Sequence, residues 1–406
     1  MSNNINPVKP SERYVILDIL RGIALLGICL ANYPEFSLYT FQSSEVVGAM
    51  PTAHIDHIFR YFHYIFIEGK FYSIFSLLFG IGFSIIISSY KQKMGSGFSL
   101  FFRRMAVLFV IGLCHLYFLW AGDILILYAA IGFFLPLFIN MSNKKLLIYS
   151  GILLLIPILV DALIVIFEWN LSASVITATQ YFHDKTGITQ DNFPVWLVNG
   201  ENFIDILKFN LGGSFIRMQE FIEGNRVFKV LGLFLIGLYI GRNKIYTHLD
   251  DYKQQLRKIR NYGFLIGFPI SCLMAWHILN SYPLGQVANS AMYALSVVPL
   301  SLAYVAVICL WYVSNKNSPV FNIMAAPGRM ALTNYIGQSV FGIIIFYGIG
   351  FKLGATMGLI YVEFIALGVF ALQIVLSYLW LRYFQFGPLE WIWRMLTYGK
   401  WLKLKK

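Results

Sequence analysis

The sequence is dominated by long apolar stretches that polar residues interrupt at intervals. We count about ten of them, near residues 14–34, 69–90, 102–120, 123–141, 145–167, 227–242, 261–281, 291–313, 325–350 and 357–384. A helix needs about 20 apolar residues to cross the hydrocarbon core of a bilayer. Only 12% of the 406 residues are charged, whereas a soluble domain is about one quarter charged. The chain is therefore predicted to be all-α, a polytopic membrane helical bundle that forms one integral membrane domain over residues 1–406.

Basic residues predict the orientation of this bundle. Most of the 31 lysines and arginines fall in every second connection and at the chain ends, for example Lys9, Arg13, Lys91, Lys93, Lys144, Lys253 and Lys405. Cytoplasmic loops carry this excess of positive charge. Both termini are therefore predicted to be cytoplasmic, with outer loops near 35–68 and 168–226, and the chain to be multi-pass in the cell membrane. The net charge of +12 then indicates anionic lipid as the partner rather than nucleic acid.

The C-terminal segment 385–406 carries tryptophans and basic residues together. Trp391 and Trp393 lie beside Arg394 and the basic tail. Such a segment is typical of a helix that lies at the inner membrane surface.

No metal site or disulfide framework is expected. Cys29, Cys114, Cys272 and Cys309 all lie in apolar stretches and lack CxxC spacing. The first outer loop contains His54, Asp56, His57 and His63, and its His-x-Asp-His run suggests a metal, but a zinc site needs three or four converging ligands.

Charged residues fall inside the first apolar stretch. The helix must begin near Tyr14 to reach spanning length, which draws Asp18 and Arg21 into the bilayer. Arg21 and Asn32 are eleven residues apart, so they lie within about 20° of each other around a helix. Intramembrane charges usually face a bundle interior or a cavity. The alternative is a structural Asp18–Arg21 pair that only joins helices.

The third stretch repeats the eleven-residue spacing. Arg104 lies at its cytoplasmic end, His115 near its outer end, and Asp123 follows a turn at 121–122. If the first and third helices face each other, they form a polar seam with arginines inside and Asn32 and His115 outside. A histidine beside a carboxylate is the usual arrangement for a general base. The alternative is an interfacial His115 that is hydrogen-bonded to a carbonyl.

Four further polar residues are expected to be structural. Lys70 marks the outer end of the second stretch, and Arg329 the cytoplasmic mouth of the ninth. Asn334 and Gln338 are one turn apart and are expected to bridge helices by hydrogen bonds.

Five blocks of sequence resemble the YeiB-like integral membrane proteins, a bacterial family of unknown function. They are LDILRGIALLGICLAN, GKFYSIFSLLFGIGF, RRMAVLFVIGLCHLYFLWAGDILILYAAIG, GRMALTNYIGQ and WLRYFQFGPLEWIWRMLTYGKW. These blocks run from Leu17 to Trp401, so the resemblance covers nearly the whole chain. The histidines of the first outer loop do not belong to this pattern.

A more distant similarity links the first helix to transmembrane acyltransferases. The spacing from Arg21 to Asn32 resembles the Arg-x10-His of the acyltransferase-3 family and the Arg-x10-Asn of the heparan-glucosaminide acetyltransferases. This resemblance implies transfer of an acyl group from cytoplasmic acyl-coenzyme A to an acceptor, often a glycan. Asn32 cannot act as a general base, so His115 would have to supply that function.

The leading hypothesis is therefore an acyltransferase with acyl-coenzyme A as co-substrate. His115, oriented by Asp123, would deprotonate a hydroxyl or amine of a small-molecule or glycan acceptor, and Asn32 would stabilise the oxyanion. Arg21 and Arg104 would hold the phosphates of the co-substrate. Two alternatives stay open: a transporter or flippase that uses the seam as a path, and a membrane protein without catalytic activity.

Overall fold

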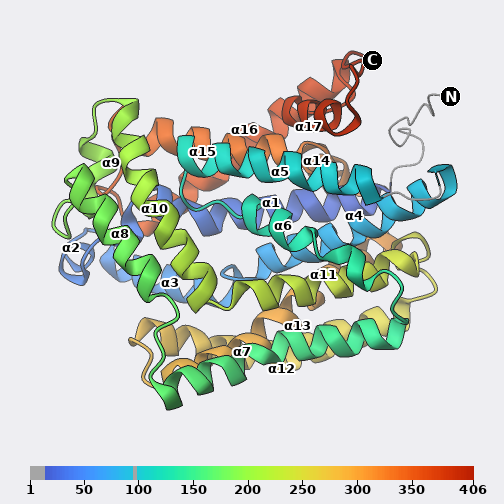
Figure 1. Ribbon diagram of the computed structural model, residues 1–406, viewed down its shortest axis with the longest axis horizontal. Coiled ribbons are helices and arrows are strands. Elements are labelled where there is room, and N and C mark those ends of the chain that lie inside the picture. Colours follow the sequence, from blue (N-terminus) through green and yellow to red (C-terminus); the bar gives the residue numbers. More distant parts are fainter. Residues whose placement is uncertain (1–13, 95–97) are drawn as a thin grey trace.

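The computed structural model describes residues 14–94 and 98–406 and is built from helices. Most of the long helices run along the longest axis of the molecule (Figure 1). In these residues the extended pairing is limited to one isolated bridge between Phe384 and Lys405. The helices are α1 (Val15–Phe36), α2 (Ser44–Gly48), α3 (Ala53–Phe66), α4 (Lys70–Met94), α5 (Phe98–Phe118), α6 (Leu125–Gly132), α7 (Asn143–Phe167), α8 (Ala173–Thr186), α9 (Trp196–Asn199), α10 (Phe203–Glu223), α11 (Arg226–Arg242), α12 (Lys253–Leu279), α13 (Gly285–Ser314), α14 (Pro319–Arg329), α15 (Ala331–Phe346), α16 (Leu359–Tyr383) and α17 (Pro388–Tyr398), with short 3-10 turns η2 (Tyr39–Phe41), η3 (Leu135–Phe138), η4 (Phe193–Val195) and η5 (Ile245–Thr247).

Seven helical segments of the described chain are long and apolar enough to cross a membrane: Val15–Phe36, Ala53–Ser88, Phe98–Phe118, Asn143–Phe167, Lys253–Leu279, Gly285–Ser314 and Leu359–Tyr383. They match seven of the ten predicted stretches. The prediction of a multi-pass, all-helical membrane protein is confirmed.

The other three predicted stretches form shorter or interrupted helices. Residues 123–141 divide into α6 and the 3-10 turn η3, where Pro136 lies in the first turn. Residues 325–350 divide between α14 and α15, because the backbone at Met330 leaves the helical region with φ −115° and ψ 37°. Residues 227–242 form the 17-residue α11. Hydropathy alone did not predict these breaks, because the interrupted segments remain apolar.

The two predicted outer loops are largely helical. The first contains α2 and α3, and the second contains α8, α9 and α10. These short helices gather at the end of the bundle opposite α17 (Figure 1). Asn202 begins α10 by accepting hydrogen bonds from the backbone amides of Ile204 and Asp205, as an N-cap does.

Small residues allow α4 and α11 to pack closely. A Cβ on Gly80 would lie 2.1 Å from the Phe234 carbonyl oxygen, and one on Gly237 would lie 2.1 Å from the Leu77 carbonyl oxygen. The backbones therefore touch at this crossing, as small-residue faces permit in membranes. Gly80 of the second stretch is thus a packing residue.

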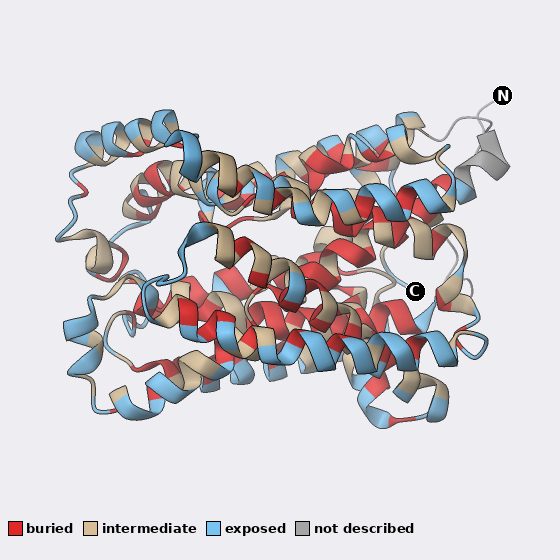
Figure 2. Cartoon of the chain, turned by 90° about the horizontal axis from the view of Figure 1, so that it is seen from below, coloured by how far each residue is buried: buried red, intermediate tan, exposed pale blue. Residues whose placement is uncertain are grey.

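Buried residues lie between the helices, and exposed residues lie on their outward faces (Figure 2). Many outward residues are large and apolar, such as Leu159 on α7, Leu265 on α12 and Phe364 on α16. Exposing so much apolar surface to water would be unfavourable, whereas the hydrocarbon core of a bilayer accommodates it. These faces are the lipid contacts of the bundle.

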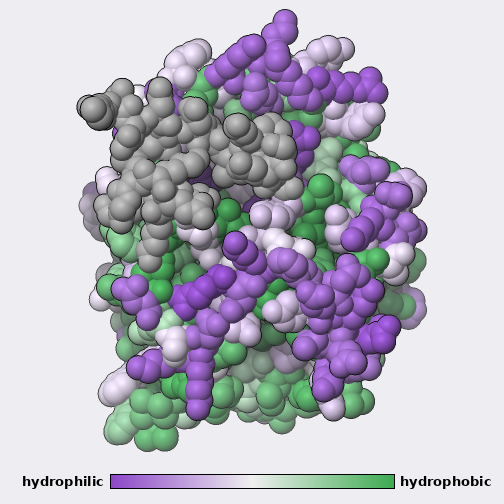
Figure 3. Space-filling view, turned by 90° about the vertical axis from the view of Figure 1, so that its right-hand side faces the viewer, coloured by the Kyte–Doolittle hydropathy of each residue, from purple (hydrophilic) through white to green (hydrophobic). Residues whose placement is uncertain are grey.

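Hydrophilic residues spread over the end of the molecule that carries α17 (Figure 3). The first turn of α1 lies at this same end (Figure 1), which agrees with the predicted common side of the two termini. Lys9 and Arg13 lie outside the described residues, as do the side chains of Lys91 and Lys93. Which membrane face this end occupies stays a prediction.

Candidate functional site

Helix α1 lines two cavities at different heights of the bundle. Arg21 and Ile28 lie in the wall of the first cavity, which we call the arginine cavity. Ala31 and Glu35 lie in the wall of the second, which we call the mixed-charge cavity. Ile28 and Ala31 are three residues apart, a rise of about 4.5 Å along the helix. One turn of α1 therefore separates the two cavities along its length.

The arginine cavity has a volume of about 260 Å³ and a cationic end. Its four arginines come from different helices: Arg21 from α1, Arg104 from α5, Arg329 from α14 and Arg394 from α17. Two carboxylates, Asp18 and Glu390, also line it, and the rest of the wall is mainly apolar and aromatic, with contributions from Phe75, Leu78, Phe79, Met105 and Leu108. The arrangement suits a ligand with an anionic head and an extended, less polar arm.

Two buried polar groups of this cavity have no hydrogen-bond partner in the described structure. They are the Tyr335 hydroxyl and the Nε of Arg329. Tyr335 is 7% exposed and its ring lines the cavity. Leaving a buried polar group unpaired costs about 1–3 kcal/mol. A ligand that accepts hydrogen bonds from these two groups would remove that cost.

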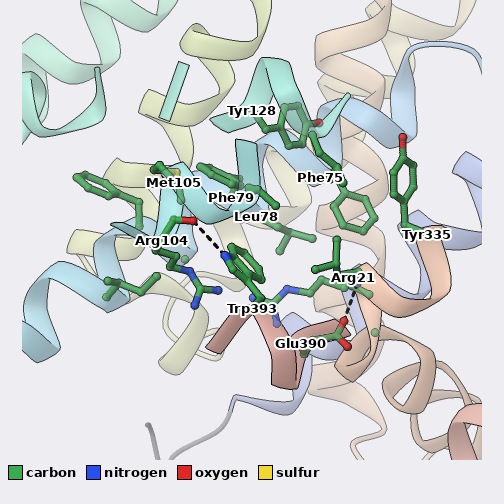
Figure 4. Close-up of a pocket in the computed structure, with 18 of the residues that line it drawn as sticks. Arg21, Phe75, Leu78, Phe79, Arg104, Met105, Tyr128, Tyr335, Glu390 and Trp393 are labelled. Atoms are coloured by element: carbon green, nitrogen blue, oxygen red, sulfur yellow. Dashed lines mark hydrogen bonds between the residues drawn. The ribbon is translucent and has the colours of Figure 1, made fainter. Parts of the chain in front are cut away.

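Helix α17 closes one side of the arginine cavity, opposite Tyr128 and Phe79 (Figure 4). The Arg104 guanidinium stacks 3.7 Å from the centre of the Trp393 ring, and the Trp393 indole N–H donates to the Arg104 carbonyl oxygen at 3.0 Å. The Glu390 carboxylate accepts from the backbone amide of Leu332 at 2.7 Å and from the hydroxyl of Thr333 at 2.6 Å. Glu390 therefore caps the start of α15.

The electrostatics of Glu390 reflect two opposing effects. Burial raises the pKa of its carboxyl group, while hydrogen bonds from Thr333 and Leu332 lower it, and burial has the larger effect. The cap thus ties α17 to α15 through a half-buried carboxylate.

Arg21 pairs with Asp18 at the cationic end of the cavity. The Arg21 Nη1 lies 2.8 Å from the Asp18 Oδ1, and the two side chains are 29% and 7% exposed. The pair predicted from the three-residue spacing is present. Both residues also line the cavity, so the pair holds the guanidinium at the cavity wall.

His115 forms a hydrogen-bonded chain with Asp123 and Ser339. Its Nδ1 lies 2.7 Å from the Asp123 Oδ2, and its Nε2 lies 2.8 Å from the Ser339 Oγ. The second Asp123 oxygen accepts from the Ile126 amide at 2.8 Å. The side chains of His115 and Asp123 are fully buried, and the imidazole packs against Tyr335 with ring centres 5.2 Å apart. The chain joins α5, the start of α6 and α15.

The predicted shared seam is wrong in its outer half. The residues that line the arginine cavity include Arg21 and Arg104 but neither His115 nor Asn32, and the mixed-charge cavity lacks these two residues as well. Tyr335 lies against His115 and is itself a wall residue of the arginine cavity. Asn32 is only partly buried. Helical spacing could not show that the ring of Tyr335 packs against His115 at the wall of the cavity.

The mixed-charge cavity is larger, about 520 Å³, and has charges of both signs. Its acidic residues are Glu35, Glu68 and Glu220, and its basic residues are Arg60, Arg226 and Lys229. His63 and four tyrosines, Tyr39, Tyr64, Tyr282 and Tyr293, also line it. It lies at the end of the bundle that carries α2 and α3.

A short stretch of α4 and its hydrogen bonds lie between the two cavities. Tyr128, a wall residue of the arginine cavity, donates to the Tyr72 carbonyl oxygen at 2.8 Å, and its hydroxyl lies 2.8 Å from the Ser76 Oγ. The Tyr72 hydroxyl in turn bonds to that of Tyr293, a wall residue of the mixed-charge cavity. Polar groups thus run from one cavity to the other.

The polar residues predicted to be structural have different surroundings. Lys70 is fully buried and its Nζ donates to the Tyr64 carbonyl oxygen at 2.6 Å. The Asn334 amide donates to the Ser377 hydroxyl at 2.9 Å, and the Gln338 amide to the Gln373 side-chain oxygen at 3.2 Å, so both bridge α15 to α16. Arg329 instead lines the arginine cavity.

Sequence reasoning missed Ser339, Glu390 and His63. Ser339 is 224 residues from its partner His115, and no local pattern joins them. Glu390 lies in the segment 385–406 that the sequence predicts at the membrane surface, and nothing in that pattern predicts its contact with α15. Sequence position groups His63 with the other histidines of the first outer loop, but α3 turns His63 inward and leaves His54 and His57 exposed. A strong amphipathic pattern over Ala53–Phe66 could have given this signal.

In the described residues, no group of three or more His, Cys, Asp or Glu could hold a metal ion.

Comparisons with known proteins agree on the family. Residues 240–400 match the family model described as "Protein of unknown function (DUF418)". The chain is 30% identical over 98% of its length to an "Uncharacterized 39.9 kDa protein in amylase 3'region" of Bacillus acidopullulyticus, covering 97% of that protein. It is 27% identical to "Uncharacterized protein YxaH" of Bacillus subtilis (100% of this chain, 99% of that one) and 27% identical to "Uncharacterized protein YeiB" of Escherichia coli (95% and 96%). No solved structure matches. The chain therefore belongs to the YeiB-like family of membrane proteins of unknown function.

Proposed function

We propose that this protein is an acyltransferase of the bacterial inner membrane that takes its acyl group from coenzyme A at the arginine cavity. The observation that carries the proposal is the set of four arginines from four helices around a mainly apolar cavity. Guanidinium groups bind phosphates by paired, charge-assisted hydrogen bonds. Coenzyme A combines phosphates with a long uncharged arm that ends in the thioester.

The dimensions of the cavity agree with this binding mode. A volume of about 260 Å³ holds the arm and a short acyl group, while the nucleotide would rest on the hydrophilic end of the molecule (Figure 3). From Arg21 to Ile28 the rise along α1 is about 10 Å. The thioester would then approach the level of Tyr335, whose hydroxyl is buried without a protein partner.

His115 has a positioning role in this proposal and does not act as the base. Both of its ring nitrogens are hydrogen-bonded and its side chain is fully buried. It holds the face of Tyr335 and the hydroxyl of Ser339 in place from behind the cavity wall. The base must come from a group that the acceptor can reach.

Binding of acetyl-coenzyme A to the purified full-length protein tests the proposal. The double variant Arg104→Gln/Arg329→Gln should weaken binding at least tenfold, and binding to the unaltered protein should weaken as salt rises, because charged contacts are screened. Arg103→Gln is the matched control, since Arg103 is the exposed neighbour of Arg104 and is not a wall residue of the cavity. Absence of measurable binding, or equal weakening by the control, would refute the arginine cavity as the donor site.

A flippase or transporter is the second candidate, and the break between α14 and α15 favours it. Interrupted helices near binding sites are common in transporters, and residues on both sides of this break, Arg329 and Leu332, line the arginine cavity. Proteoliposomes with a fluorescent phosphatidylserine distinguish the candidates. Faster dithionite bleaching of inner-leaflet lipid would support lipid movement, and bleaching at the rate of empty liposomes would remove this candidate.

A further inference from the structure

The mixed-charge cavity is a built site that the proposed donor chemistry does not use. Three carboxylates and three basic side chains line it, so the charges in its wall balance (Glu35, Glu68, Glu220, Arg60, Arg226 and Lys229). A strongly charged ligand gains little from such a wall, because each charge is repelled as well as attracted. The wall favours a small polar molecule without net charge that has several hydrogen-bonding groups.

His63 occupies a distinctive place in this wall. It is 8% exposed, and its Nδ1 lies 3.1 Å from the Glu363 Oε1 on α16. Its Nε2 faces the other side, where the Glu68 Oε2 lies 3.8 Å away, within ion-pair distance but beyond hydrogen-bond distance. Both His63 and Glu68 line the cavity, and Glu363 does not. The Nδ1 of His63 is therefore held by the carboxylate of Glu363, outside the cavity wall. The Nε2 faces Glu68, which lines the cavity.

This geometry matches the requirements for a general base. A carboxylate behind one nitrogen orients the imidazole and stabilises its protonated form. The second Glu363 oxygen is buried without a partner in the described structure, so it can strengthen its interaction when His63 gains a proton. A histidine that only joined α3 to α16 would not need to lie in a cavity wall.

The position of the cavity relative to α1 connects it to the donor. Ala31 lines the mixed-charge cavity, and Arg21 lies about 15 Å below it along the helix. An extended coenzyme A arm that is held at Arg21 spans a distance of this order. The acyl carbon would then lie near the level of the α4 segment that separates the two cavities, and this segment must shift for the acyl group to reach the acceptor.

We infer that the mixed-charge cavity is the acceptor site, that it binds a small polar molecule without net charge through a hydroxyl or amine, and that His63 is the catalytic base. The inference rests on the proposed acyltransferase function. The acceptor O–H or N–H gives its proton to His63 Nε2 as the oxygen or nitrogen bonds to the thioester carbon. The C–S bond then breaks, coenzyme A leaves as the thiolate, and the protonated His63 releases its proton to solvent.

Variants of His63 separate this inference from the donor site. Membranes with the full-length protein are incubated with acetyl-coenzyme A that is labelled in the acetyl group, and label in products other than acetyl-coenzyme A and free acetate is counted. His63→Gln should reduce label transfer at least 100-fold, with acetyl-coenzyme A binding unchanged within twofold. His57→Gln is the matched control, because His57 lies on the same helix and is exposed; it should leave both quantities unchanged.

A second experiment does not depend on how His63→Gln folds. In a cysteine-free background, Thr40→Cys places a thiol in the wall of the cavity, and Glu45→Cys places one on α2 outside it. A methanethiosulfonate reagent should block label transfer only with Thr40→Cys and should leave acetyl-coenzyme A binding intact in both. Binding with transfer that survives both His63→Gln and labelled Thr40→Cys would overturn the acceptor site alone. Failure of the unaltered protein to bind acetyl-coenzyme A would overturn the proposed function as well.

Discussion

The hydroxyl of Ser339 lies 2.8 Å from the Nε2 of His115, on the opposite side of the ring from the Asp123 carboxylate. The order Asp123, His115, Ser339 resembles that of a hydrolase triad. Unlike a hydrolase triad, this chain of residues is buried away from both cavities, because neither Ser339 nor His115 lines either of them. In this protein the chain of hydrogen bonds ties three helical segments together behind Tyr335.

His115→Gln should therefore destabilise the fold. The substitution leaves Asp123 or Ser339 without its partner, which costs about 1–3 kcal/mol for each buried group. Thermal unfolding of the detergent-solubilised protein should show a lower Tm, and acetyl-coenzyme A binding should weaken because Tyr335 loses its support. His54→Gln, at an exposed position on α3, should change neither. A variant with the Tm of the unaltered protein that has lost only label transfer would show instead that His115 takes part in the chemistry.

Asp18 and Arg21 should behave as a coupled pair. Removing one partner leaves the other as an uncompensated charge in the membrane, which costs more than removing both. Asp18→Asn and Arg21→Gln should each reduce the yield of monodisperse protein more than the double variant does. Fluorescence-detected size exclusion measures this yield.

The pair Asp205–Lys208 is the control for that double-mutant cycle. It has the same three-residue spacing, with nitrogen and oxygen 3.4 Å apart, but its lysine side chain is 43% exposed. Solvent-exposed pairs contribute little, so its single and double variants should match the unaltered protein. Additive losses in the Asp18–Arg21 cycle would mean that the two residues act separately.

His183 should make the packing of α8 against α10 sensitive to acid. Burial lowers the pKa of His183 below its usual value near 6.5, and its Nε2 is buried without a hydrogen-bond partner in the described residues. The unfolded chain binds the proton more readily than the fold does, so stability is present above about pH 6.5 and falls as the pH drops below it. The Tm should fall more between pH 7.5 and 5.5 for the unaltered protein than for His183→Gln. Equal falls would assign the acid sensitivity to other groups.

Cysteine accessibility tests the orientation. In a cysteine-free background, Glu45→Cys and Lys185→Cys should react with an impermeant maleimide in intact cells, and Lys253→Cys should react only after lysis. All three positions are exposed. The reverse pattern would place the arginine cavity outside the cell, where coenzyme A is absent, and would remove the donor proposal.

The sequence predicted the features that depend on neighbouring residues. Hydropathy located the long helices, and the three-residue spacing predicted the pair of Asp18 and Arg21. It did not predict contacts between distant segments, such as the Glu390 cap on Leu332 and Thr333. Such contacts depend on how helices pack, and helical periodicity carries no information about packing partners.

Helix α1 lines both cavities, so its twist also sets the angle between the directions in which Arg21 and Glu35 point. Each residue turns a helix by about 100°. One residue inserted between Ile28 and Ala31 would leave Arg21 in place and swing Glu35 by roughly a quarter turn, out of the mixed-charge cavity. Four inserted residues would nearly restore its direction but lengthen the path by about 6 Å. The first helix therefore fixes both the distance and the angle between the two cavities. The segment between Arg21 and Glu35 should tolerate substitutions far better than insertions or deletions.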